Sequence, residues 1–226
     1  MFVVAWLALV AWSIPVFLAL ESLAPRTAAP TRWRAIAVAC ALVGIDAALA
    51  RVLAIMPPAG TAARTALAIV LVELADYGLH RAMHAVPLLW RFHRLHHVDE
   101  PLAWHVAWRL HPVDATLFAA GTTAACFLAG APLPAAVAFV VGRRVWTTVI
   151  HANVAWPPSV LDHVIATPAF HSVHHAERAN FASTLPLIDR LFGTYRGSRT
   201  ANVEPCSGSL ATSIVPPCAS TSLRTM

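Results

Sequence analysis

Charged residues are scarce in this chain of 226 residues, and their scarcity argues against a soluble protein. Asp, Glu, Lys and Arg make up 12% of the sequence, whereas a soluble globular domain carries about 25%. Hydrophobic residues make up 58%, and the mean hydropathy is +0.64. The composition therefore predicts an integral membrane protein. The net charge of +5 is small and its arginines lie in short loops, which indicates membrane orientation rather than nucleic-acid binding.

Cysteine motifs and built-in electron carriers are also lacking. The four cysteines have no C-x-x-C spacing, so neither a zinc ribbon nor a disulfide scaffold is indicated. The sequence has no G-x-G-x-x-G motif for a nicotinamide or flavin, and no cysteine set for an iron–sulfur cluster. The stretch "HPVD" at 111–114 lacks the glycines of the "HPGG" found in cytochrome b5-like domains. A reaction that consumes electrons would therefore need a separate donor protein.

Long apolar stretches recur along the chain. The first, residues 1–20, has no basic residue ahead of it, which favours an uncleaved membrane helix over a signal peptide. The second covers 35–56, and the third covers 62–79 and ends where Glu73, Asp76 and two histidines mark its exit from the lipid. Residues 113–150 are broken at "AGAPLP" (129–134), which predicts two spans joined by a tight turn. We expect an all-α polytopic membrane protein with four to five membrane-embedded helices.

Two charged residues interrupt the second stretch. Asp46 and Arg51 would each cost ~2.5–3.5 kcal/mol at the middle of the bilayer. Either they pair with other helices, or this span is tilted and partly buried in protein.

Arginine placement predicts the orientation. Arg26, Arg32 and Arg34 lie between the first two stretches, so that loop should be cytoplasmic. Counting the crossings puts both histidine-rich segments on the cytoplasmic face, and we expect a multi-pass protein of a bacterial inner membrane. The predicted organisation is N-terminal transmembrane helices at 1–61, a metal-binding domain at 62–196, and a disordered Ser-, Thr- and Pro-rich tail at 197–226.

Histidine is abundant, and all twelve histidines lie between positions 80 and 175. They form four groups: "HRAMH" (80–84), "HRLHH" (93–97), "HANVAWP" (151–157) and "HSVHH" (171–175). Residues three or four apart share one face of a helix, so each H-x-x-H-H pattern should point its three imidazoles the same way. A lone interfacial histidine is usually only a hydrogen-bonded polar residue, but the repeated spacing is hard to explain in that way.

Imidazole nitrogens are ligands for iron, zinc, copper and nickel. Nine histidines are too many for one tetrahedral zinc, which takes four ligands. The sequence therefore predicts two metal ions that share these nitrogens. His105 and His163 fall outside the repeated patterns and are expected not to be ligands, whereas the pattern leaves His111 open.

The motifs carry a family resemblance. "DYGLHRAMHAVPLLWRFHRLHHVDE", "RLHP", "IHANV", "TPAFHSVHHAERANF" and "IDRLFGTYR" occur in order between residues 70 and 196 and resemble the fatty acid hydroxylase/sterol desaturase superfamily. The resemblance implies a membrane-embedded, all-histidine centre of two iron ions, with zinc as a possible substitute. It also implies an oxidoreductase that uses dioxygen at the cytoplasmic face to hydroxylate or desaturate lipids, sterols or carotenoids.

The same resemblance suggests roles for individual residues. The implied metal ligands are His80, His84, His93, His96, His97, His151, His171, His174 and His175. Some relatives have a further histidine where this chain has Ala155, so the tenth position falls to His111, Asn153 or water. Asp76 precedes His80 by one helical turn and could accept the second ring N–H of that ligand. Asn153 is a further candidate to support the ligands, and Asn180 and Asp189 are expected to be loop and helix-cap residues.

Two functions of different classes fit these patterns. The first is a lipid oxygenase that takes electrons from a ferredoxin-like or cytochrome-like protein, with Trp90, Trp104 and Trp108 lining the substrate path or forming an aromatic belt at headgroup depth. The second is a non-catalytic metal-binding membrane protein or a divalent-cation transporter. A transporter should carry its ligands near the middle of the membrane, whereas these histidines gather at the ends of the apolar stretches.

Overall fold

The computed structural model describes residues 2–26, 33–34, 36–38, 56–57, 59–98, 102–156 and 159–198. These residues are helical, and their only β contact is an isolated bridge between Pro25 and Val154. In chain order the elements are α1 (Phe2–Leu23), α3 (Ala62–Ala85), α4 (Pro87–His93), η2 (Trp104–Trp108), α5 (Pro112–Ala129), α6 (Leu133–His151), η3 (Val160–His163), α7 (Pro168–Ala176) and α8 (Pro186–Leu191).

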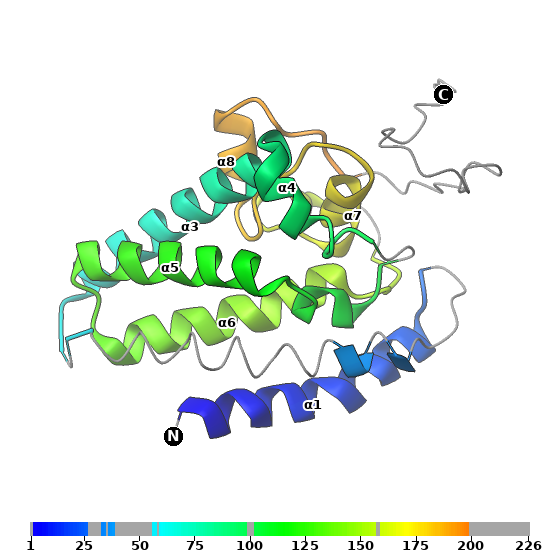
Figure 1. Cartoon of the computed structure of the whole chain (residues 1–226), viewed down its shortest axis with the longest axis horizontal. Coiled ribbons are helices and arrows are strands. Elements are labelled where there is room, and N and C mark those ends of the chain that lie inside the picture. The colour runs from blue at the N-terminus through cyan, green and yellow to red at the C-terminus, as the bar shows by residue number, and fades with distance from the viewer. Residues whose placement is uncertain are drawn as a thin grey trace.

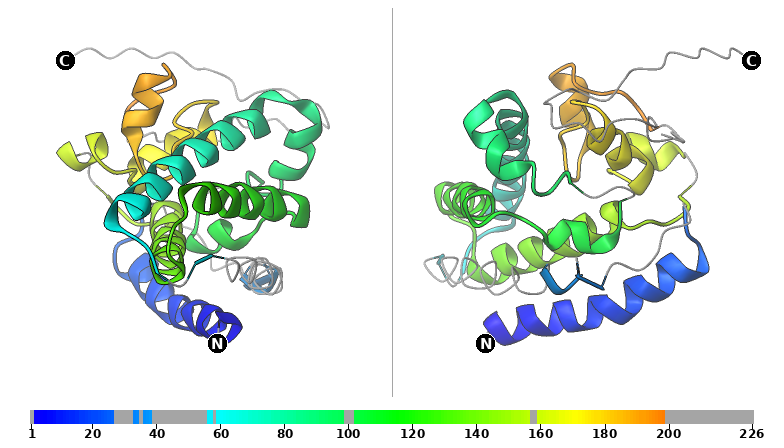
Figure 2. Two further views of the ribbon diagram at one scale, coloured as in Figure 1. Left: turned by 90° about the vertical axis from the view of Figure 1, so that its left-hand side faces the viewer. Right: turned by 45° about the vertical axis from the view of Figure 1, so that its right-hand side comes forward.

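The long helices form the body of the molecule, and the short helices gather at one end of it (Figure 1). Helix α3 packs along α5, while α6 contacts η2 and α7. The two views of Figure 2 agree that α1 lies beside α6, and that α4, α7 and α8 lie on the side of the molecule away from α1. The C-terminal ends of α3 and α6 and the N-terminal end of α5 therefore meet near α4 and α7.

Helices α5 and α6 are the two candidate membrane spans among the described residues, being long and apolar enough to cross a bilayer. The break predicted at 129–134 is present, because α5 ends at Ala129 and α6 begins at Leu133. Gly130 has a φ of 63°, a left-handed conformation that a residue without a Cβ adopts easily. The N–H of Ala131 then donates to the carbonyl of Cys126, which satisfies an otherwise free carbonyl at the end of α5.

The other predicted spans have different outcomes. The first apolar stretch forms one continuous helix, α1, with Pro15 inside it. Most of the second stretch lies outside the described residues, and so do Asp46, Arg51 and the predicted tail beyond 198. The third stretch does not end at residue 79, since α3 continues through "HRAMH" to Ala85. It stops there because Pro87 disfavours a helical conformation at Val86, whose ψ is 117°.

Glu73 and Asp76, which the sequence predicted to mark the exit of this stretch from the lipid, face the interior of the protein. Both side chains are buried between α3 and α6, where Arg143 pairs with them. Arg143 Nη2 lies 2.8 Å from Asp76 Oδ2, and Arg143 Nε lies 3.3 Å from Glu73 Oε1. These three residues, which we call the buried ion cluster, explain why a helix in an apolar region carries two carboxylates. The pairing partner lies 67 to 70 positions away, so helical spacing could not reveal it.

We expect Arg143→Met to destabilise the protein strongly, because it leaves two buried carboxylates without their cation. Breaking one side of a buried ion pair costs on the order of 3–5 kcal/mol. The exposed Arg64 on α3 is the matched control, and Arg64→Met should change the unfolding free energy by less than about 0.5 kcal/mol. Unfolding of both variants in detergent measures the difference, and equal stability would contradict the assigned role of the cluster.

Candidate metal centre

Nine histidines converge near the end of α3 in two groups. The first group, which we call the five-histidine group, is formed by His80, His84, His93, His97 and His174. The second, the four-histidine group, is formed by His96, His151, His171 and His175. Within each group one ring nitrogen from every histidine lies within 4.8 Å of all the others. These are the nine residues that the sequence motifs indicated, and no other histidine belongs to either group.

The two H-x-x-H-H motifs each contribute to both groups. In "HRLHH" the i and i+4 residues, His93 and His97, join the five-histidine group, whereas the i+3 residue, His96, joins the other. In "HSVHH" the assignment is reversed, because His171 and His175 join the four-histidine group and His174 joins the first.

The expectation that each motif aims three imidazoles at one point was therefore wrong. Positions i and i+4 stay together, while i+3 points to the neighbouring group. In "HRLHH" the helix α4 already ends at His93, and the chain continues as turns in which the N–H groups of residues 95–97 donate to the third residue back. Together the two motifs link the two groups.

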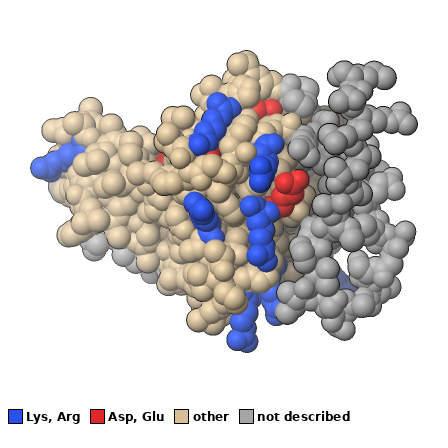
Figure 3. Space-filling model, turned by 90° about the horizontal axis from the view of Figure 1, so that it is seen from above, with Lys and Arg blue, Asp and Glu red and all other residues tan. Residues whose placement is uncertain are grey.

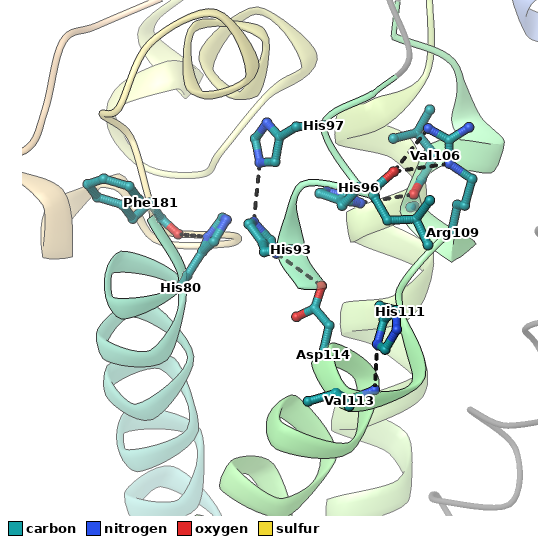
Figure 4. Close-up of polar contacts among 12 residues, drawn as sticks. His80, His93, His96, His97, Val106, Arg109, His111, Val113, Asp114 and Phe181 are labelled. Carbon is teal, nitrogen blue, oxygen red and sulfur yellow. Dashed lines mark hydrogen bonds and ion pairs between the residues drawn. The ribbon is translucent and has the colours of Figure 1, made fainter. Parts of the chain in front are cut away.

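Backbone carbonyls fix the orientation of several rings. The Nδ1 atoms of His80, His96 and His174 lie 2.7, 3.1 and 2.9 Å from the carbonyl oxygens of Phe181, Val106 and Ala179. Figure 4 shows the first two of these bonds. His151 Nδ1 is likewise 2.5 Å from the carbonyl of Thr147. Because a carbonyl only accepts, each of these Nδ1 atoms carries the hydrogen, and each Nε2 of a neutral ring presents a lone pair.

A carboxylate fixes one further ring. His93 Nδ1 lies 3.0 Å from Asp114 Oδ2, and both side chains are buried (Figure 4). Asp114 lies in the first turn of α5, and α5 contacts α4, the helix that ends at His93. The sequence patterns do not reveal this residue, because Asp114 lies 21 positions from His93 and outside the histidine motifs. A carboxylate that accepts from a histidine in this way makes the other ring nitrogen a better ligand.

The Nε2 atoms face one another at ligand spacing. His151 Nε2 lies 2.9 Å from both His96 Nε2 and His171 Nε2, and His97 Nε2 lies 3.2 Å from both His93 Nε2 and His174 Nε2. In the pair His96–His151 both Nδ1 atoms already donate, so two lone pairs face each other unless a cation lies between them. Two imidazoles bound at a right angle to one metal, with bonds of ~2.1 Å, place their nitrogens ~3.0 Å apart. The arrangement therefore fits a metal ion in each group.

Orphaned nitrogens support the same interpretation. His80 Nε2 and both ring nitrogens of His84 and His175 are buried and have no hydrogen-bond partner among the described residues. Burial without a partner is costly for a polar atom, and a bound metal would remove that cost.

Burial also keeps the rings in the neutral form that binds metals. Desolvation, followed by the positive charge of neighbouring rings, lowers the pKa of His80 to about 4. Burial likewise holds the pKa of His96, His97 and His174 well below the ordinary value of 6.5. At neutral pH these imidazoles have already lost the proton that a metal would have to displace.

Residues outside the groups hold the supporting carbonyls in place. Asp189 accepts hydrogen bonds from the N–H groups of Phe181 and Ala182 at 2.8 and 2.9 Å, which fixes the loop that supports His80. Asn180, at a φ of 52°, donates to the carbonyls of Phe170 and Gly197. The expected loop role of Asn180 is confirmed, whereas Asp189 supports a loop rather than capping a helix.

Arg109 holds the segment between His93 and His97 in place. Its guanidinium donates to the carbonyl of Leu95 at 3.2 and 3.1 Å, which fixes the turn between His93 and His97 (Figure 4). No sequence pattern predicts this contact, because Arg109 lies outside the histidine motifs.

Some expected residues lie elsewhere. His111 caps α5, where its Nδ1 accepts from the N–H of Val113 at 3.1 Å, and it belongs to neither group. Asp76 does not accept from His80, which donates to Phe181 instead; Asp76 accepts from Ser183 and pairs with Arg143. Asn153 donates its backbone N–H to Glu21 of α1. As expected, His105 and His163 lie outside both groups.

A cavity of about 160 Å³ opens beside the histidines, between α3, α5 and α6. Both groups border it, through His80, His93, His96, His151 and His171. Ala115, Phe118 and Val140 are among its apolar lining, and Asp76, Arg143 and Ser183 among its polar lining. Trp90, Trp104 and Trp108 do not line it, so the cavity does not support the first of the two roles predicted for them. Trp104 and Trp108 pack in a core with Phe17 of α1.

Comparison with known proteins identifies related sequences. The family model described as "Fatty acid hydroxylase" matches residues 65–194, more than half of the chain. An ornithine lipid hydroxylase of Rhizobium tropici is 32% identical over 134 residues, which cover 57% of this chain and 40% of the relative. A very-long-chain aldehyde decarbonylase of Oryza sativa is 33% identical over 147 residues, covering 60% of this chain and 24% of the relative.

The likeness is partial at the level of whole proteins. The very-long-chain aldehyde decarbonylase CER1 of Arabidopsis thaliana is 28% identical over 141 residues, covering 54% of this chain and 22% of the relative. The chain thus spans between about a fifth and two fifths of these relatives. No solved structure matches the chain significantly.

Removing the Asp114 carboxylate should weaken metal binding. We expect Asp114→Ala to lower the affinity of the centre by ~10–100-fold, the usual cost of losing the partner of a ligating histidine, and Asp114→Asn to retain part of it. The exposed Glu177 is the control, and Glu177→Ala should leave the affinity unchanged. Competition with a chromophoric chelator measures both, and unchanged affinity in Asp114→Ala would argue against a positioning role.

The metal-free protein should lose stability as the pH falls. The pKa of His80 is about 4 in the folded chain and 6.5 in the unfolded chain, so between these values the unfolded state binds more protons. Stability is then complete above pH 6.5 and decreases below it, by ~1.4 kcal/mol per pH unit for each histidine that takes up a proton. Thermal unfolding of chelator-treated protein between pH 7.5 and 5 tests this, and a flat profile would contradict it.

Proposed function

The chain belongs to the fatty acid hydroxylase family, and from that premise we propose that it is a membrane-bound di-iron oxygenase that hydroxylates or desaturates a lipid. The observation that carries the proposal is the convergence of nine imidazoles in two groups beside a cavity between candidate membrane helices. The proposed ligands are the members of the five-histidine and four-histidine groups. The ornithine lipid hydroxylase relative supports a lipid as the substrate class.

The proposed reaction balances as a mono-oxygenation. One C–H bond of the lipid, dioxygen, two electrons and two protons yield a C–OH bond and one water. Bound iron would supply the oxidising chemistry, which no side chain of the chain can provide. Desaturation consumes the same dioxygen and electrons but removes two hydrogens from the lipid and forms two waters.

The protein contributes position, a dry site and polar contacts. The carbonyl and carboxylate partners hold the ligand rings rigidly, which is the preorganisation that a reactive centre requires. Ala115, Phe118 and Val140 offer a hydrocarbon an apolar wall beside His80 and His93, and exclude water from it. Ser183 and Asp76 also line the cavity, and Ser183 Oγ donates to Asp76 Oδ2 at 2.8 Å, so a hydroxyl proton is held at the cavity wall.

We also propose the membrane placement predicted from the sequence, with several crossings and the histidines at the cytoplasmic face. Both candidate spans support it, because the N-terminal end of α5 and the C-terminal end of α6 lie beside the histidine groups. Arg26, Arg32 and Arg34 lie in the loop between the first two apolar stretches, which would lie on this side. A substrate dissolved in the bilayer could then reach the cavity along α5 and α6.

His96→Ala should abolish lipid oxidation, with turnover falling by at least ~100-fold, because His96 would bind the four-histidine metal directly. His111→Ala is the matched control and should retain activity, since His111 belongs to neither group. The assay is lipid profiling by mass spectrometry of a deletion strain complemented with each variant, together with iron-dependent oxygen consumption by the purified protein.

Three results would contradict the oxygenase. The first is an unchanged lipid profile in the deletion strain, and the second is full rescue by His96→Ala. The third is a protein that is stable only with zinc bound and consumes no oxygen after it is loaded with iron. The last would favour the alternative of a non-catalytic metal-binding protein or cation transporter.

A further inference from the structure

Trp90 of α4 connects the surface to the five-histidine group. Its ring centroid lies 5.0 Å from that of His84 and 5.4 Å from that of His97. The residue is half-buried, and its indole is tilted by 44° and 46° against the rings of these two proposed ligands. It does not line the substrate cavity, so a role in substrate binding does not account for it.

Four exposed arginines lie on α3, α4 and the segments next to the five-histidine group. Arg91 and Arg94 are exposed on α4 and the turn after it, and Arg81 is exposed on the last turns of α3, which packs against α4. Arg178 is exposed and near His84: burial and the rings of His80 and His93 lower the pKa of His84 most, and the charge of Arg178 lowers it further. We call Trp90 with Arg81, Arg91, Arg94 and Arg178 the α4 face.

The α4 face carries net positive charge. Among the residues that the structure describes, no carboxylate forms an ion pair with these four arginines. Seen from above, several arginine side chains lie on the visible face, with a smaller number of acidic side chains among them (Figure 3). All 16 basic residues of the chain are arginine, the side chain best suited to bind carboxylates at an interface.

The chemistry of the proposed function calls for a partner at such a surface. Each turnover would consume two electrons, and the chain has no motif for a nicotinamide, a flavin or an iron–sulfur cluster. A surface with a central tryptophan and flanking arginines has the composition of an interface hot spot. Charge complementarity speeds the encounter with an acidic protein and orients it, which suits a short-lived electron-transfer complex.

We propose that the α4 face docks an acidic one-electron carrier protein, and that electrons enter the five-histidine group past the indole of Trp90. In each encounter the reduced carrier is oxidised by one electron and the proposed metal centre is reduced by one; two encounters and two protons from solvent supply one turnover. Trp90 itself stays unoxidised, since the indole only fills the gap between the carrier and the rings of His84 and His97. This inference rests on the proposed function.

Binding to the full-length chain in detergent tests the surface without any need for catalysis. The probes are two soluble acidic carriers, a plant-type [2Fe–2S] ferredoxin and the haem domain of a cytochrome b5. Arg91→Gln combined with Arg94→Gln and Arg178→Gln should weaken binding by at least ~10-fold and flatten its salt dependence, because three screened attractions are lost. Arg64→Gln, at the other end of α3, is the matched control and should bind like the natural chain.

Trp90→Leu separates docking from electron entry. It should leave carrier binding within a few-fold of the natural value, but slow the oxidation of the reduced carrier by at least ~10-fold in stopped-flow measurements. Lipid oxidation driven by dithionite and a small mediator should survive in both the arginine and the tryptophan variants. Loss of that reaction in the natural chain as well would count against the proposed function rather than against the docking surface.

Three outcomes overturn the inference. The first is that neither carrier binds the natural chain at low salt. The second is that the arginine triple variant binds the carriers as tightly as the natural chain. The third is that the triple variant loses binding to vesicles containing phosphatidylglycerol while keeping its affinity for the carriers. The last would identify the α4 face as a contact for anionic lipids.

Discussion

The metal centre depends on the hydrogen bonds that fix which nitrogen of each histidine carries the proton. Carbonyl oxygens of Phe181, Val106, Thr147 and Ala179 accept from Nδ1, and so does the carboxylate of Asp114. Each bond leaves the Nε2 lone pair of its ring directed into a group of like lone pairs. The folded chain without metal therefore holds mutually repelling acceptors in a buried space, and a cation in each group would turn this repulsion into binding.

The rest of the fold keeps these partners in place. The short helices α4 and α7 bring the two H-x-x-H-H motifs together, and Asp189 and Arg109 fix the segments that carry the Phe181 carbonyl and His96. Helix α6 has two roles, since His151 at its end joins the four-histidine group and Arg143 within it neutralises the carboxylates of α3. The cavity lies between these features, so the walls that would hold a lipid also hold the ligands.

The sequence predicted the members of the site better than their arrangement. Histidine spacing and the family resemblance together named all nine residues of the two groups, and the pairs His80/His84, His93/His97 and His171/His175 stay together because i and i+4 share one face of a helix. They could not show that His96 and His174 join the group opposite to their motif partners, since that depends on the turn after His93 and on how α7 docks. Asp114 and Arg143 were missed for a similar reason: their partners lie 21 and about 70 positions away, and local periodicity carries no information on such pairs.

The central claim is that the chain binds two metal ions through histidine nitrogens alone. The most direct test is anaerobic titration of the metal-free protein with ferrous iron, followed by X-ray absorption at the iron edge. The account predicts two iron ions per chain and a set of nearest neighbours made up of imidazole nitrogens and, at most, solvent oxygen. Binding of a single ion, or a set of neighbours dominated by carboxylate oxygen, would contradict it.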